Sequence, residues 1–140
     1  MNSSLTIRIV DPDEPYLGLA IAASNGRFAG SANIYADVDA LVKLAAWLDG
    51  FPCSAFDRRS FELGFKDSGA AGGFLGIVAH ADRHAGAAAI ELEFIDGAPV
   101  EATDTAPFSI RVEAAGVDRF VQSVRAIQGA ESGEATLHGV

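Results

Sequence analysis

Residues 35–52, with the sequence YADVDALVKLAAWLDGFP, constrain the fold most strongly because they carry the clearest helical pattern in the chain. At about 3.6 residues per turn, the apolar side chains of this stretch gather on one face and the polar ones on the other. The apolar face consists of Val38, Leu41, Leu44, Ala45 and Leu48, and the opposite face of Asp39, Lys43, Ala46 and Asp49. We expect Asp37 to be the N-cap of this helix, and Gly50 and Pro52 to end it.

Strands are predicted on both sides of this helix because apolar and polar residues alternate there. The alternating runs are 5–10, 16–24 and 27–35 before the helix, and 60–65, 74–80, 87–95 and 108–113 after it. Asn25 and Gly26 tolerate positive φ and predict a hairpin, after which Phe28 should begin the inward side of the return strand. In one run two sets compete for the core face, Leu75 with Ile77 and Phe74 with Val78.

A second amphipathic helix is predicted between about residue 114 and Gly129. Residues 117–129 echo residues 38–50 weakly, which is compatible with a two-fold repeat of a β-meander followed by a helix. The predicted fold class is α+β, with a mostly antiparallel sheet of about seven strands and two helices packed on one face. We expect one domain over residues 1–128 and a C-terminal polar tail over residues 129–140, whose side chains are small and polar.

The composition excludes several classes of partner. The net charge is −9 and no cluster of Lys or Arg offsets it, which argues against nucleic acid and anionic membranes. No apolar run approaches the roughly 18 residues needed to span a membrane, and no signal peptide is evident. With Cys53 as the single cysteine, these features predict a cytoplasmic protein. The charge allows a basic protein partner, although acidity can also serve solubility alone.

His80, Asp82 and His84 form the cluster that looks most like a catalytic or metal site. Alternate residues of a continuing strand face one way, so these three side chains could converge on a metal ion. A turn that begins at Asp82 would scatter them, and the cluster would then be a polar hairpin end. Cys53 has no motif that pairs it with a base, and the glycines of residues 69–73 lack the Lys of a phosphate-binding loop. No cofactor is expected.

A set of charged residues is predicted to face outward on three of the strands. It consists of Glu62, Glu91, Glu93, Arg111 and Glu113. If these strands adjoin, the set forms an acidic field that would attract a basic protein and respond to salt. The alternative is a solvated sheet face without a partner. Glu91 and Glu93, which share one side of a strand, are also more typical of such a face than of an acid–base pair in a cleft. Trp47, beside the apolar stripe of the first helix, could edge the core or face a partner.

Several short segments resemble small bacterial immunity-type proteins of polymorphic toxin systems. They are Ile34-Tyr35 before the helix, Gly50-Phe51-Pro52 after it, residues 61–64, and Asp82-Arg-His-Ala-Gly86 before residues 90–93. The last resembles an Asp-x-x-Gly-His turn, although here the His precedes the Gly. This resemblance implies a non-enzymatic protein that binds a partner. We therefore expect a protein-binding module, of the type of an immunity inhibitor, that acts through the acidic sheet surface. The alternative is a small metal-dependent hydrolase that uses His80, Asp82 and His84.

Overall fold

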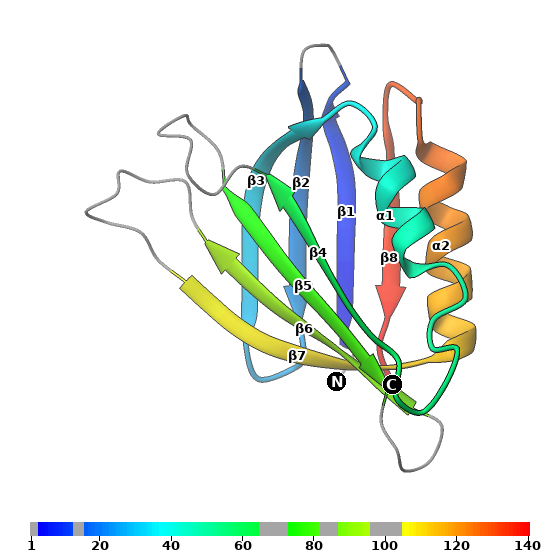
Figure 1. Ribbon diagram of the computed structural model, residues 1–140. Helices are drawn as coiled ribbons and strands as arrows, with labels where there is room; N and C mark the ends of the chain where they lie inside the picture. Colours follow the sequence, from blue (N-terminus) through cyan, green and yellow to red (C-terminus); the bar gives the residue numbers. More distant parts are fainter. Residues whose placement is uncertain (1–2, 13–15, 65–72, 82–86, 96–104) are drawn as a thin grey trace.

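The computed structural model describes residues 3–12, 16–64, 73–81, 87–95 and 105–140, with the backbone alone described at 87 and 105–107. The described residues form two antiparallel sheets of four strands each and two α-helices (Figure 1). Sheet A has the order β3-β2-β1-β8, made of β1 (Ser4–Asp11), β2 (Tyr16–Ser24), β3 (Ala29–Asp37) and β8 (Gly133–His138). Sheet B has the order β4-β5-β6-β7, made of β4 (Arg58–Gly64), β5 (Phe74–Ala81), β6 (Ala87–Ile95) and β7 (Thr105–Glu113). The helices are α1 (Ala40–Leu48) and α2 (Ala114–Ile127).

The predicted α+β class, the antiparallel pairing and the two helices are confirmed, but the single sheet of about seven strands is not. The two sheets lie one in front of the other, and β3 of sheet A contacts all four strands of sheet B. The helices lie side by side at the flank of the two sheets, where α2 contacts β8 and α1 contacts β4 (Figure 1). The core therefore lies between two sheets and a helix pair, rather than under one sheet face.

The polar tail predicted for residues 129–140 is wrong for its central part, which forms β8. This strand pairs with β1, and the hydroxyl groups of Thr6 and Thr136 lie 3.1 Å apart. Ala135 and Leu137 are buried and are the only two inward side chains with which the strand joins the core. Beyond β8, the Val140 N–H donates to the Arg111 carbonyl of β7 at 3.0 Å, so this segment also joins the two sheets. Two apolar positions give too short an alternation to be recognised in the sequence.

Helix α1 begins later than the sequence predicts. Asp37 is the last residue of β3, and the N-cap position falls on Asp39, which makes no capping hydrogen bond with its side chain. Val38, which was expected on the apolar face, is 49% exposed because it precedes the helix. The remaining apolar residues of the predicted face are buried, so the periodicity located the helix correctly although its first turn was misplaced.

The turn between β2 and β3 is longer than the predicted hairpin. The Asn25 Oδ1 accepts hydrogen bonds from the N–H groups of Arg27 (2.9 Å) and Phe28 (2.8 Å), which forms a turn stabilised by an Asn side chain. Phe28 therefore belongs to the turn and is 63% exposed, so its predicted inward position is wrong.

The inner faces of the two sheets meet across an inward-facing glycine of β3. A Cβ atom on Gly30 would lie 2.7 Å from the Phe94 ring, which is closer than carbon atoms can approach, and 3.2 Å from the Phe108 ring, which is a tight contact. These two rings stack at a centroid distance of 6.1 Å and fill the space that Gly30 leaves. Among the described residues, none of the helices has the length and apolar character needed to cross a membrane.

Candidate functional site

The outer face of sheet B presents its residues in cross-strand rows. The strand register gives the rows Glu62–Gly76–Glu93–Pro107, Ser60–Val78–Glu91–Ser109 and Arg58–His80–Ala89–Arg111. Residues at alternate positions, such as Leu75, Ile77 and Leu92, are buried on the inner face. Of the competing sets in β5, Leu75 and Ile77 face the core with Leu92, whereas Phe74 is on the outer side although it is also buried, at 5% exposure, and Val78 is half-buried. The charges on the outer face differ from one end to the other, since carboxylates mark the first row and basic groups the third.

The structure brings together only part of the predicted acidic set. Glu62 and Glu93 lie in one row, and Glu91 lies in the next. Glu113 pairs with Ala87, six residues along β6 from Glu93, which places it roughly 20 Å from that row at about 3.4 Å per residue. The row that contains Arg111 separates the two positions. The acidic site is therefore smaller than predicted and consists of Glu62, Glu91 and Glu93.

Besides Arg111, two basic residues of this face bear on its charge. Arg58 is exposed and pairs in register with His80, although the sequence prediction began the strand at Ser60 and so missed it. The His80 Nε2 lies 3.3 Å from the Glu91 Oε1, which gives that carboxylate a partner. For Glu62 and Glu93, by contrast, the described part of the chain supplies no ion pair. These two are the carboxylates left available to a partner.

The metal cluster predicted at His80, Asp82 and His84 cannot be placed as a unit. Asp82 and His84 lie outside the described residues, and His80 contacts Glu91 on the outer face. Within the described ranges, no group of three or more His, Cys, Asp or Glu side chains is arranged to hold a metal ion. The hydrolase alternative therefore gains no geometric support from the residues that the structure describes.

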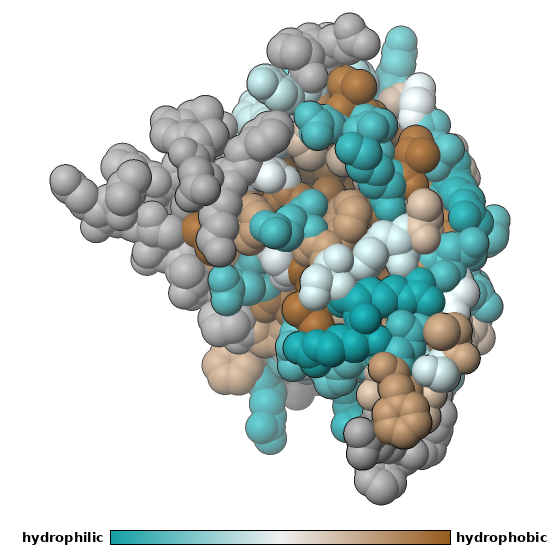
Figure 2. Space-filling view, viewed as in Figure 1, coloured by the Kyte–Doolittle hydropathy of each residue, from teal (hydrophilic) through white to brown (hydrophobic). Residues whose placement is uncertain are grey.

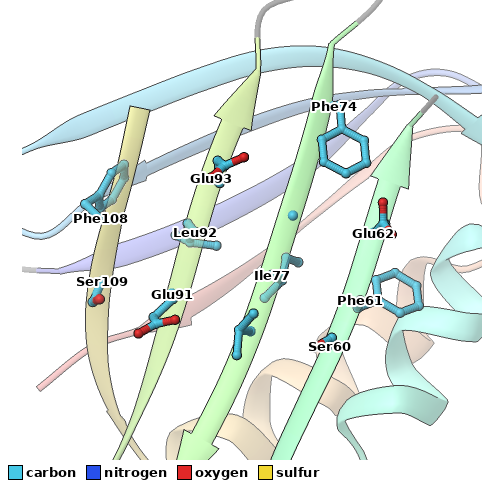
Figure 3. A pocket seen from close by; sticks show the side chains of 12 residues that line it. Ser60, Phe61, Glu62, Phe74, Ile77, Glu91, Leu92, Glu93, Phe108 and Ser109 are labelled. Carbon is cyan, nitrogen blue, oxygen red and sulfur yellow. The ribbon is translucent and has the colours of Figure 1, made fainter. Parts of the chain in front are cut away.

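A hollow of about 530 Å³ opens on the outer face of sheet B over Gly76 (Figure 3). It is lined by Ser60, Phe61, Glu62, Phe74, Gly76, Ile77, Val78, Glu91, Leu92, Glu93, Phe108 and Ser109. Glu62 and Glu93 project on either side of β5, and Phe74 lies on β5 toward the end where this strand begins. Figure 2 shows the same side of the molecule, where hydrophilic residues surround apolar ones. The hollow thus combines an apolar floor with carboxylates at its sides.

Gly76 lines this hollow, and the packing of the described residues does not require a glycine there. Among the described residues, a Cβ atom on Gly76 would meet only the edge of the Phe74 ring, at 3.5 Å and 4.0 Å, which is ordinary van der Waals contact. The pairing with β4 and β6 continues through this position without a bulge, and Gly76 is not among the glycines with positive φ. A glycine inside a strand weakens the strand and often marks a place where a ligand or another backbone approaches. Within the part of the chain that the structure describes, neither a bulge, a positive φ nor a close contact accounts for Gly76, which makes this position a candidate contact point for another molecule.

A second charged cluster, near α1, is structural. Arg59 forms two hydrogen bonds with the Asp57 carboxylate, at 3.0 Å and 2.9 Å, and its Nη1 donates to the carbonyls of Trp47 and Asp49 at 2.8 Å each. These carbonyls are at the C-terminal end of α1 and lack partners within the helix. The hydrogen bonds from Arg59, together with the Cys53 N–H, lower the pKa of Asp57 from 3.8 to about 2. We call Asp57 and Arg59, with the carbonyls of Trp47 and Asp49, the clamp; both of its charged groups are used within the protein.

Trp47 edges the core, which is one of the two positions considered for it. Its ring packs against Phe61, with 5.1 Å between the ring centroids. Its indole N–H is buried and has no hydrogen-bond partner within the part of the chain that the structure describes. This tryptophan therefore contributes to packing between α1 and β4.

Two of the sheet edges are already occupied. On β3, the Asn33 carbonyl accepts a hydrogen bond from the Gly73 N–H at 2.8 Å. On β7, the Ser109 carbonyl accepts one from the Asn25 side chain at 3.0 Å. An added strand would need these carbonyl groups, so strand addition at β3 or β7 is disfavoured. The faces of the sheets are better placed than these edges to contact a partner.

Comparison of the chain with protein-family models, with curated proteins and with solved structures gives no match. The geometry of the outer face of sheet B is therefore the basis for assigning a function.

Proposed function

We propose that this protein is a protein-binding module that binds a basic protein through the carboxylate end of the outer face of sheet B. The observation that carries the proposal is the pair Glu62 and Glu93, which flank the hollow at Gly76 without an ion pair from the described residues. Opposite charge on a partner would guide its encounter with this face and fix its orientation. An inhibitor of the immunity type, which covers a basic surface of its toxin, is one class of protein that binds in this way.

The form of the hollow favours a binding role over catalysis. Glu62, Glu91 and Glu93 are exposed side chains on an open sheet face. An acid–base pair of carboxylates generally needs a site that shifts the two pKa values apart by burial or by close neighbours. A protein partner, in contrast, can use exposed carboxylates directly, because its own surface excludes the water on binding.

Affinity capture from native lysate tests the proposal, with the purified protein as bait and Glu62→Lys/Glu93→Lys as the variant. We expect the native bait to retain a basic protein and the variant to lose it, with retention of the native complex falling as salt rises. The matched control is Glu131→Lys/Glu134→Lys, which makes the same change of net charge at exposed positions outside sheet B. Equal retention by all three baits would show that the partner binds elsewhere, and capture of no basic protein would contradict the proposal.

A further inference from the structure

We infer that the hollow at Gly76 receives an arginine side chain of the basic partner. This inference rests on the proposed function, and it adds which side chain is recognised and where. It starts from the observation that packing against the described residues gives no reason for a glycine at position 76. An alanine would fit at this position with ordinary contacts and would strengthen the strand, and yet the position holds the residue without a side chain. The missing side chain leaves room between two carboxylates.

The spacing of the carboxylates matches a guanidinium group. Glu62 and Glu93 occupy the same row on the strands at either side of β5, so their backbones are separated by two strand spacings, or roughly 9.6 Å. Because these side chains rise from the strands on either side of β5, a cation placed over Gly76 would lie between their carboxylates (Figure 3). A guanidinium presents donors along more than one edge and can bind two carboxylates at once, whereas the ammonium of lysine is a compact point charge.

The floor of the hollow suits the remainder of an arginine side chain. Val78 lies next to Gly76 along the outer face of β5 and is half-buried, and Phe74 lines the hollow on the other side of Gly76. Arginine commonly packs its methylene groups on apolar surface while its charged end reaches polar groups. The row beyond Val78 contains Arg58, whose guanidinium would repel a second cation and so limit the site to the carboxylate end.

A peptide titration followed by NMR tests this inference with a defined probe. The probe is the blocked peptide Gly-Gly-Arg-Gly-Gly, compared with peptides that carry lysine or the neutral isostere citrulline in place of arginine. We expect the arginine peptide to shift the amide resonances of Gly76 and Glu93, with a dissociation constant on the order of millimolar for one side chain. The lysine peptide should bind several-fold more weakly, and the citrulline peptide should cause no shift. Equal binding of the lysine and arginine peptides, or no binding of the arginine peptide, would overturn the inference.

Filling the hollow without a change of charge separates it from general electrostatic attraction. We expect Gly76→Val to weaken binding of the arginine peptide at least tenfold and Gly76→Ala to weaken it less. Ala89→Val, two residues before Glu91 on the same outer face, is the control and should leave binding unchanged. Thermal unfolding of each variant verifies the fold. Unchanged binding by folded Gly76→Val or Gly76→Ala would show that the hollow is not the site.

The two proposals fail in different ways. If Gly76→Val still captures the basic partner from lysate while Glu62→Lys/Glu93→Lys does not, the carboxylate face binds the partner and the arginine inference is wrong. If the native protein captures no basic protein, the proposed function is contradicted and the inference that depends on it falls as well.

Discussion

Gly30 on β3 and Gly76 on β5 are both glycines inside strands, but they lie in opposite kinds of surroundings. Gly30 faces the junction between the sheets, where Phe94 and Phe108 leave no room for a side chain. Gly76 faces outward, where a Cβ atom would meet, of the residues that the structure describes, only the edge of Phe74 at ordinary distance. The first glycine is explained by close packing in the interior of the protein. Packing against the described residues does not explain the second glycine, and its open surroundings therefore favour a role in binding.

The same contrast applies to the charged residues of the two regions. At the junction of sheet B with α1, the Arg59 and Asp57 side chains are 20% and 8% exposed and bond to each other and to backbone groups. On the outer face, the described residues leave Glu62 and Glu93 without ion pairs. Removal of one member of a largely buried charge pair is costly because it leaves the other charge unpaired, whereas exposed charges without partners contribute little to stability and remain available to another molecule.

Removal of the clamp should give the largest effect in this comparison. We expect Arg59→Ala to lower the free energy of unfolding by about 3 kcal/mol, because it leaves the Asp57 carboxylate and the α1 carbonyls without their donor. Urea unfolding followed by circular dichroism measures the change. Arg58→Ala, at the exposed neighbouring position on the outer face, is the control and should cost less than about 0.5 kcal/mol. Equal costs at the two positions would remove the distinction between junction and outer face.

Addition of a methyl group at the junction should come next in size. We expect Gly30→Ala to destabilise the protein by about 2 kcal/mol, because the sheets must separate to relieve contact with Phe94 and Phe108. The measurement is the urea midpoint at a constant slope. Combination with Phe94→Leu should restore part of the loss, since the smaller side chain makes room for the methyl group. Simple additivity of the two costs would argue against contact between these positions.

Acid should weaken the junction through Asp57, whose pKa is lowered to about 2 by Arg59. A carboxyl group with a depressed pKa stabilises the folded state above its unfolded pKa and loses this effect as the pH falls through its folded pKa. We expect the stability difference between native protein and Asp57→Asn to shrink by up to about 2 kcal/mol between pH 4 and pH 2. Urea unfolding at a series of pH values measures it. A difference that stays constant over this range would show that Asp57 has no depressed pKa.

Replacement of glycine by alanine should have the opposite effect at Gly76 on the outer face from its effect at Gly30, and we expect it to be the smallest of the four changes in stability. We expect Gly76→Ala to raise the free energy of unfolding by about 0.5 to 1 kcal/mol, because alanine loses less conformational freedom than glycine when a strand forms. The urea midpoints of Gly76→Ala and Gly30→Ala should therefore move in opposite directions from that of the native protein. A loss of stability at Gly76 would mean that packing requires this glycine, and the main reason for a ligand at the hollow would then disappear.

The alternation of residues was enough to find most of the strands and their inward sides. The run 87–95 was predicted with the bounds that β6 has, and its glutamates face outward as expected. By contrast, the hollow could not be predicted although Gly76 lies in a recognised strand. The width of the hollow depends on which strands lie beside β5. The position of Glu113 was predicted to be outward, but its distance from Glu93 follows from the register of β6 with β7.

The sequence by itself determined where both helices and most of the described strands form and which of their side chains turn inward, since these depend on near neighbours and on the period of the pattern. Tertiary structure alone decided that the strands divide into two sheets and that residues 133–138 complete the first of them beside β1. It also decided that Gly30 meets two aromatic rings while Gly76 faces an open hollow between carboxylates. The physical reason is that strand pairing and sheet packing join segments far apart in the chain, and an alternating pattern specifies a buried side without specifying the partner that buries it.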